Sequence, residues 1–139
     1  MSLKTQDLFN VSNKVVVVTG GSRGIGEMIT SGFLANNSKV YITARKEEAL
    51  VKKAEELSQK YACECIPISG DISNTDGIDA LVNFLNDAEP EGIDYLINNA
   101  GAAWGANYDD FPESGWGQSN GSKFENTIFP NTKINTTIR

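Results

Sequence analysis

Apolar runs of strand length alternate with amphipathic stretches between residues 14 and 101. The first run, Val15–Val18, consists of four consecutive valines and is followed by Thr19. A continuous run of β-branched residues predicts a strand that is buried on both faces of a parallel sheet. Similar runs predict three further strands, over residues 39–43, 64–68 and 93–98.

The segments between these runs carry apolar residues three and four positions apart, which predicts helices over 27–35, 46–61 and 75–86. The apolar positions at helical spacing are Ile25, Ile29, Phe33 and Leu34 for the first, Leu50, Ala54, Leu57 and Tyr61 for the second, and Ile78, Leu81, Val82 and Leu85 for the third.

This alternation of strands and helices predicts the fold class. A β-α-β-α-β-α-β order implies parallel strands joined by right-handed crossovers. We therefore expect an α/β, Rossmann-type doubly wound sheet with strand order 3-2-1-4, truncated after the fourth strand. Pro67 lacks an N–H group, which suits the edge position of the third strand in that order.

The pattern is absent at both ends of the chain. Residues 1–13 are expected to form a polar leader, and 102–116 to form a loop. Residues 117–139 are rich in Asn, Thr, Ser and Gly and follow no sustained period of two or 3.6 residues. We therefore expect a truncated Rossmann domain over 1–116 and a tail over 117–139 that is disordered or frameshifted.

Composition narrows the functional classes. A length of 139 residues allows one domain, and a net charge of −6 argues against nucleic acid and anionic membrane surfaces as partners. The N-terminus lacks the apolar core of a signal peptide, and no run reaches membrane-spanning length, so we expect a cytoplasmic protein. Cys63 and Cys65 are expected to be reduced and packed in the sheet, and no metal site is expected in a chain without histidine.

Three glycines follow the first predicted strand, at Gly20, Gly24 and Gly26. Between a buried strand and a helix, such glycines permit a tight turn, bring backbone N–H groups close to a pyrophosphate, and let the helix pack on the strand. The turn is not a P-loop, because no Lys-Ser/Thr follows the last glycine. By itself it could also serve only sheet packing.

Three motifs in order make the resemblance specific. Residues 19–26, TGGSRGIG, match TGxxxGxG; Asp71-Ile72 follow the third predicted strand; and residues 98–101 read Asn-Asn-Ala-Gly. Over residues 14–116 the chain resembles the short-chain dehydrogenase/reductase family. The resemblance implies an aspartate against adenine and an NNAG motif near the nicotinamide. The alternatives are that Asp71 caps a helix and that Asn98 and Asn99 only tie loop backbone together.

The predicted cofactor is NADP(H). NAD-preferring sites place a carboxylate after the second strand, whereas this chain has Ala44 and Arg45 there and Arg23 in the glycine turn. Two guanidinium groups and the Ser22 hydroxyl suit a 2′-phosphate, although both arginines could instead be solvated surface cations. The expected cofactor-binding residues are Gly20, Ser22, Arg23, Gly24, Ile25, Gly26, Arg45, Asp71, Ile72, Asn98, Ala100 and Gly101.

The resemblance also implies a catalytic serine and a Tyr-x-x-x-Lys pair, but no tyrosine of this chain has a lysine four residues later. Full-length family members reduce ketone or 3-oxoacyl groups, and residues 102–105 and 111–116 resemble ketoacyl-type and ketone reductases. We expect this chain to be inactive alone, with the family's homo-oligomer interface lost. A non-catalytic NADP-binding or interaction module, or a non-functional truncation product, are the alternatives.

One hypothesis accounts for the tail. Codons can be chosen for GQSNGSKFENTIFPNT, which starts at Gly117, so that a frame shifted by one nucleotide reads DKVMDLNLKTPFFLT. That reading resembles the family's next helix. We therefore expect that a one-nucleotide insertion near codon 117 shifted the frame.

Overall fold

A parallel sheet of four strands forms the centre of the protein, in a computed structural model that describes residues 3–101. The strand order is β3-β2-β1-β4, which confirms the predicted Rossmann-type order. All neighbouring strands pair in parallel, and Val17 of β1 is in register with Tyr41 of β2 and Leu96 of β4. The strand bounds are Val15–Thr19 for β1, Lys39–Ala44 for β2, Cys65–Ser69 for β3 and Tyr95–Ile97 for β4.

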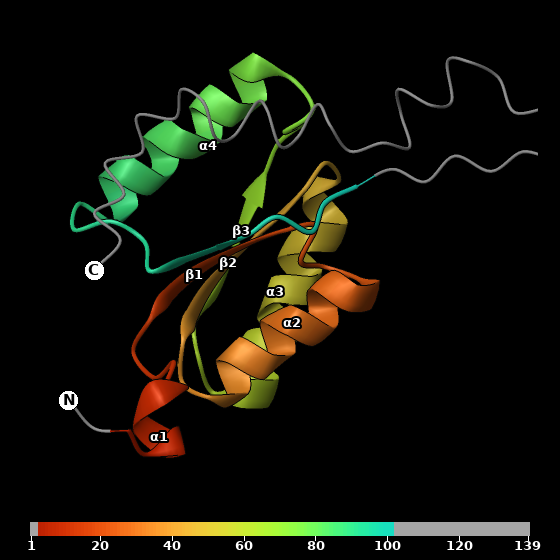
Figure 1. Cartoon of the computed structure of the whole chain (residues 1–139). Helices are drawn as coiled ribbons and strands as arrows, with labels where there is room; N and C mark the ends of the chain where they lie inside the picture. The colour runs from red at the N-terminus through yellow and green to blue at the C-terminus, as the bar shows by residue number, and fades with distance from the viewer. Residues whose placement is uncertain (1–2, 102–139) are drawn as a thin grey trace, which may run out of the picture.

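Helices cover both faces of this sheet (Figure 1). The helix bounds are Thr5–Leu8 for α1, Gly24–Ala35 for α2, Glu47–Tyr61 for α3 and Thr75–Ala88 for α4. Helices α2 and α3 lie side by side on one face, and α4 lies on the other. This arrangement places the start of each of these helices near the carboxyl ends of the strands, where doubly wound folds bind their ligands.

The alternation of side chains along β1 divides the core into two clusters. Val16 and Val18 pack with Leu34 of α2 and Leu50 of α3, whereas Val17 packs on the α4 side with Ile78. The three valines have no exposed surface. The valine run is therefore buried on both faces, as its composition predicts.

Pro67 occupies the edge strand β3, where its missing N–H group costs no ladder bond on the open side. The two cysteines are free, as predicted. Cys65 is buried in β3, and burial raises the pKa of its thiol to about 12. Cys63 is half-buried, and its Sγ lies 3.0 Å from the Ser38 carbonyl oxygen, to which it donates.

The structure corrects the N-terminal prediction and two element boundaries. Residues 5–8 of the expected polar leader form the short helix α1. Helix α2 begins at Gly24, inside the glycine turn, rather than at residue 27. Strand β4 covers 95–97 rather than 93–98; beyond its end, the N–H groups of Asn99 and Ala100 donate to the Thr19 hydroxyl instead of a neighbouring strand.

The residues that α2 buries also differ from the apolar residues that the sequence pattern predicts. Ile25 is 71% exposed, while Gly26, Thr30 and Leu34 are the buried positions. These positions are four residues apart, and the small residues among them allow α2 to approach β1 closely. The apolar faces predicted for α3 and α4 are confirmed, because Leu50, Ala54 and Leu57 are buried in α3, and Ile78, Leu81 and Leu85 in α4.

Within residues 3–101, no helix combines the length and the apolar composition that a bilayer crossing requires. The cytoplasmic location stays a prediction. The tail at 117–139 lies outside the described residues, so the division of the chain at residue 116 also stays a prediction.

Candidate active site

The turn between β1 and α2 needs glycine at two positions because of its backbone. Gly20 has φ +67° and Gly24 has φ +55°, a left-handed region that side chains disfavour. The Gly20 N–H donates to the Thr43 carbonyl oxygen at 3.0 Å, which ties the start of the turn to the end of β2. The turn therefore lies at the carboxyl edge of the two central strands.

Gly26 is required for a different reason, the contact of α2 with the turn itself. A Cβ atom at this position would overlap the Gly20 carbonyl oxygen and would lie 2.6 Å from the Asn99 Nδ2. Only glycine lets the first turn of α2 lie this close to the end of β1. The third glycine of the motif thus packs the helix against the sheet, as the spacing predicts.

The N-terminus of α2 offers unsatisfied donors at this edge. Its first helical bond runs from Glu27 N to the Arg23 carbonyl oxygen at 3.2 Å, and the cap residue Arg23 provides no side-chain hydrogen bond. The N–H groups of residues 24–26 therefore have no acceptor within the helix. A Cβ added to Gly24 would meet no atom within 4 Å, so the backbone here is open to an anion. These features fit a diphosphate at the positive end of the helix dipole.

The loop after β4 is fixed to the same turn by Thr19. The Thr19 Oγ1 accepts the N–H groups of Asn99 and Ala100, each at 3.0 Å, and donates to the Ile97 carbonyl oxygen at 3.3 Å. The Asn99 Nδ2 donates to the carbonyl oxygens of Thr19 at 3.0 Å and Gly20 at 3.3 Å. The side chain of Asn99 therefore holds backbone in place, which was the alternative considered for this motif.

Residues 98–101 are thereby placed beside the glycine turn. A Cβ at Gly20 would lie 3.2 Å from the Ala100 Cα, so the two segments are in direct contact. Asn98 and Gly101 are exposed, and Ala100 is half-buried. The predicted pyrophosphate and nicotinamide residues thus lie next to one another at one edge of the sheet.

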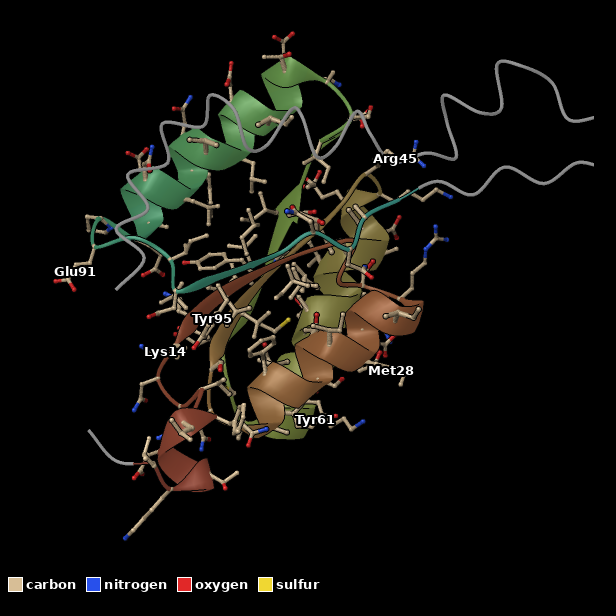
Figure 2. The ribbon with its side chains drawn as sticks, in the orientation of Figure 1. Lys14, Met28, Arg45, Tyr61, Glu91 and Tyr95 are labelled. Atoms are coloured by element: carbon tan, nitrogen blue, oxygen red, sulfur yellow. The ribbon has the colours of Figure 1, made fainter. Side chains whose placement is uncertain are left out.

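Two arginines flank this edge. Arg23 lies in the turn and Arg45 directly follows β2, and both side chains are exposed. Neither guanidinium group has an ion-pair partner among residues 3–101. Figure 2 shows Arg45 at the end of the sheet opposite to Lys14, which precedes β1. Ser22, the third predicted 2′-phosphate ligand, is half-buried in the turn.

The loop after β3 brings Asp71 to the same end of the sheet. Its carboxylate is exposed and accepts the Ser73 N–H at 3.0 Å. Hydrogen bonds from the Ser73 side chain and backbone, together with the charge of Arg45, lower the pKa of Asp71. Asn74, not Asp71, caps α4, because Asn74 Oδ1 accepts the Gly77 N–H at 2.9 Å. The helix-cap alternative for Asp71 is therefore wrong.

The structure separates the other predicted residues into side chains that a ligand can reach and side chains that are packed. Ile25 is exposed at the start of α2, whereas Ile72 is 9% exposed and packs beside Val17 in the α4 cluster. Thr19 and Thr43 shape the site but were not predicted as site residues, whereas Asn99 belongs to the predicted motif and takes the backbone-holding role that was its alternative. Thr19 could have been found from the sequence, because it is a polar residue that directly ends an apolar strand.

No group of three or more His, Cys, Asp and Glu side chains that could hold a metal ion occurs in the part of the chain described by the structure.

Comparisons with known proteins show the family of this chain. A family model described as short chain dehydrogenase matches residues 14–127. A rhamnolipid-biosynthesis 3-oxoacyl-[acyl-carrier-protein] reductase from Pseudomonas aeruginosa is 41% identical over 108 residues, which are 78% of this chain and 41% of the relative. The chain thus spans less than half the length of that curated relative.

Two solved structures have a similar fold. The NADP active-site complex of Pseudomonas aeruginosa RhlG superposes with a TM-score of 0.76 at 38% identity, covering 86% of this chain and 47% of that one. L-Sorbose reductase from Gluconobacter frateurii, complexed with NADPH and L-sorbose, gives a TM-score of 0.68 at 30% identity, covering 76% of this chain and 40% of that one.

Proposed function

The chain belongs to the short-chain dehydrogenase family, and from this premise we propose that residues 14–101 form the NADP(H)-binding part of an oxidoreductase. One observation supports this most strongly. The N-terminus of α2 has no side-chain cap, its cap residue is Arg23, and Arg45 follows β2 at the same edge of the sheet; neither arginine has an ion-pair partner in residues 3–101. Positive charge near N–H groups that have no acceptor within the helix suits a phosphorylated dinucleotide.

Each part of the edge suits one part of the cofactor. The N–H groups of residues 24–26 would hold the pyrophosphate, and Ser22, Arg23 and Arg45 the 2′-phosphate. Asp71 and the backbone of Ile72 would contact the adenine. The ribose and nicotinamide would lie beside the segment that Thr19 fixes to the turn, with contacts from Asn98, Ala100 and Gly101.

The preference for NADP(H) over NAD(H) rests on charge at the end of β2. Strand β2 ends at Ala44 and is followed by Arg45, so no carboxylate stands where an NAD-preferring site holds the ribose 2′-hydroxyl. A guanidinium group there attracts a phosphate dianion and can bind it through two parallel hydrogen bonds. The NADP and NADPH in the two similar structures support this choice.

The bound nicotinamide would supply or accept a hydride, and the reacting substrate would carry a ketone or 3-oxoacyl carbonyl. This substrate class is proposed from the relatives, which are a 3-oxoacyl reductase and a sorbose reductase. The residues described here would bind and orient the dinucleotide. Since the 139 residues contain no Tyr-x-x-x-Lys, we propose that this chain alone binds the cofactor without turning over a ketone.

Titration of the purified chain with NADPH and NADH tests the proposal. We expect NADPH to bind at least about tenfold more tightly, since charged hydrogen bonds to the 2′-phosphate contribute about 1.5–3 kcal/mol. Arg45→Ala should remove most of this difference. Lys52→Ala, which removes an equal charge from an exposed position on α3, should leave it unchanged. Equal affinities of the unmodified chain for both cofactors would contradict the assignment.

The absence of Tyr-x-x-x-Lys also favours a second candidate, a non-catalytic nucleotide-binding or interaction module. Such a module should bind NADPH and resist limited proteolysis, with greater protection when NADPH is present. A non-functional truncation product should instead be degraded rapidly and show no binding.

A further inference from the structure

Gly77 lies in the first turn of α4 and has no backbone reason to be glycine. It is the third residue of a regular helix and is not among the glycines with positive φ. Glycine inside a helix is less favourable than alanine, because it has more conformational freedom to lose on folding. A tertiary contact must therefore explain it.

That contact is with the loop that carries Asp71. A Cβ atom on residue 77 would overlap the Asp71 carbonyl oxygen and would lie 2.7 Å from its carbonyl carbon. The Gly77 N–H donates to Asn74 Oδ1 at 2.9 Å, which fixes the helix turn just where the carbonyl rests on it. The loop can fold back onto α4 only because residue 77 has no side chain.

The same loop is fixed on its other side to the strand that leads to Arg45. The Gly70 N–H donates to the Ala44 carbonyl oxygen at 3.1 Å, which continues the pairing of β3 with β2. Between these two anchors the Ile72 side chain is buried in the α4 cluster, and the Asp71 carboxylate is left exposed. The position of Asp71 relative to Arg45 is therefore set by α4 on one side and β2 on the other.

We propose that Gly77 is a positioning residue for the adenine side of the cofactor site, because its missing side chain lets α4 hold the Asp71 loop at the correct distance from Arg45. This inference rests on the proposed NADP(H) function and extends it to a residue that would not touch the cofactor. Alanine at position 77 would move the Asp71 backbone away from the helix, and the adenine contacts of Asp71 and Ile72 would move with it.

The test uses the full 139-residue chain and adenosine 2′,5′-bisphosphate, which contains the adenine and the 2′-phosphate but no nicotinamide. Gly77→Ala should weaken the binding of the bisphosphate about tenfold, since moving the Asp71 backbone off the helix would misplace the residues that contact the adenine. Gly32→Ala is the matched control, because Gly32 lies in the middle of α2 and an added Cβ would meet nothing within 4 Å. That variant should bind the bisphosphate as the unmodified chain does.

A second measurement does not depend on any ligand. The hydrogen bonds from Ser73 and the charge of Arg45 lower the pKa of Asp71. If residue 77 holds this loop, Gly77→Ala should raise the Asp71 pKa toward its ordinary value, measured by NMR titration of the carboxyl group. Amide signals of residues 70–74 should shift in the same variant, and neither change should occur in Gly32→Ala.

The outcomes separate the inference from the proposed function. If the unmodified chain fails to bind the bisphosphate, the NADP(H) assignment fails, and the Asp71 pKa still shows whether residue 77 holds the loop. Unchanged affinity and unchanged Asp71 pKa in Gly77→Ala would overturn the inference. Should that variant not fold, Asn74→Ala, which removes the acceptor of the Gly77 N–H without adding an atom, must raise the Asp71 pKa; an unchanged value there also overturns it.

Discussion

The hydroxyl group of Thr19 joins the end of β1 to the loop after β4 with three hydrogen bonds. It accepts two N–H groups and donates to one carbonyl oxygen, and the residue is 2% exposed. A buried donor that loses its only acceptor costs more than the hydrogen bond itself contributes, because no water replaces it. The Thr19 oxygen and the Asn99 amide together hold residues 99 and 100 beside the glycine turn.

Thr19→Val keeps the shape of the side chain and removes the hydroxyl group. We expect the free energy of unfolding to fall by about 2 kcal/mol, since two partly buried N–H groups lose their acceptor. Urea denaturation followed by circular dichroism measures this. Thr19→Ser keeps the oxygen atom and should cost clearly less; an equal loss in both variants would contradict the role given to the hydroxyl group.

Single residues also decide the polarity of the sheet edge. Arg23 and Arg45 provide positive charge at one edge, and the Asp71 carboxylate provides negative charge there, its pKa lowered by the hydrogen bonds from Ser73 and the charge of Arg45. The charge at this edge is therefore set by three side chains that lie far apart in the sequence. Parallel pairing of β1, β2 and β3 brings their carboxyl ends together.

At the scale of elements, the contact of α2 with β1 depends on which glycine of the helix is replaced. Gly26→Ala would place a methyl group on the Gly20 carbonyl and the Asn99 amide, and should lower the free energy of unfolding by about 2–3 kcal/mol. Gly32→Ala should raise it by about 0.5–1 kcal/mol, since alanine favours the helix and nothing obstructs it. Opposite signs in denaturant unfolding are the expected result; two stabilising substitutions would contradict the close contact.

A cluster of Glu89, Tyr41 and Lys39 connects the end of α4 to β2. Glu89 Oε1 accepts the Tyr41 hydroxyl at 2.6 Å and the Lys39 Nζ at 2.7 Å. Burial, and then the hydrogen bond to Glu89, raise the pKa of Tyr41 to about 12, and the hydrogen bond to Glu89 raises the pKa of Lys39. Both groups hold their protons more tightly in the folded chain than in the unfolded one.

This cluster predicts alkaline destabilisation. A raised pKa contributes stability that is fully present below the unfolded value of about 10 and is lost as the pH rises through the folded value. The free energy of unfolding should therefore decrease from about pH 10 toward pH 12. Tyr41→Phe should be less stable at neutral pH and should show a shallower decrease, measured by denaturant titration at several pH values. If the free energy of unfolding of Tyr41→Phe fell as steeply with pH as that of the unmodified chain, other groups would cause the alkaline decrease.

At the scale of the whole molecule, the described residues contain the edge that we propose binds the cofactor, whereas no Tyr-x-x-x-Lys occurs anywhere in the sequence. The two observations are compatible because cofactor binding and proton transfer use different parts of the family's chain. Whether the sequence after residue 116 encodes the proton-transfer residues therefore determines whether the protein can catalyse a reaction or only bind the cofactor.

The frame-shift hypothesis gives a test at this scale. Sequencing the gene around codon 117 should reveal an extra nucleotide, and deleting it should restore the reading DKVMDLNLKTPFFLT. A chain expressed from the corrected gene should then include the Tyr-x-x-x-Lys pair and oxidise NADPH in the presence of a ketone, followed by the loss of absorbance of the reduced nicotinamide. An uninterrupted gene in which neither neighbouring frame encodes that segment would refute the hypothesis.

The sequence by itself determined the order and type of the elements from β1 to β4, because hydrophobic periodicity depends on neighbours a few residues away. The valine run, the helical spacing in α3 and α4 and the edge proline were each sufficient for a correct prediction. The glycine turn and the arginine after β2 could also be recognised in the sequence, since each depends on residues that are neighbours along the chain.

Only the tertiary structure decided which side chains face the site and which glycines are needed for packing. Ile25 has helical spacing yet is exposed, because the face of α2 that packs on the sheet is the one that carries Gly26, Thr30 and Leu34. Asn99 binds backbone of the glycine turn, 79 and 80 residues earlier in the chain. Gly77 makes room for the Asp71 carbonyl, which reaches it because the loop after β3 folds back onto α4. Such contacts form only when strands and helices pack, so periodicity and composition carry no record of them.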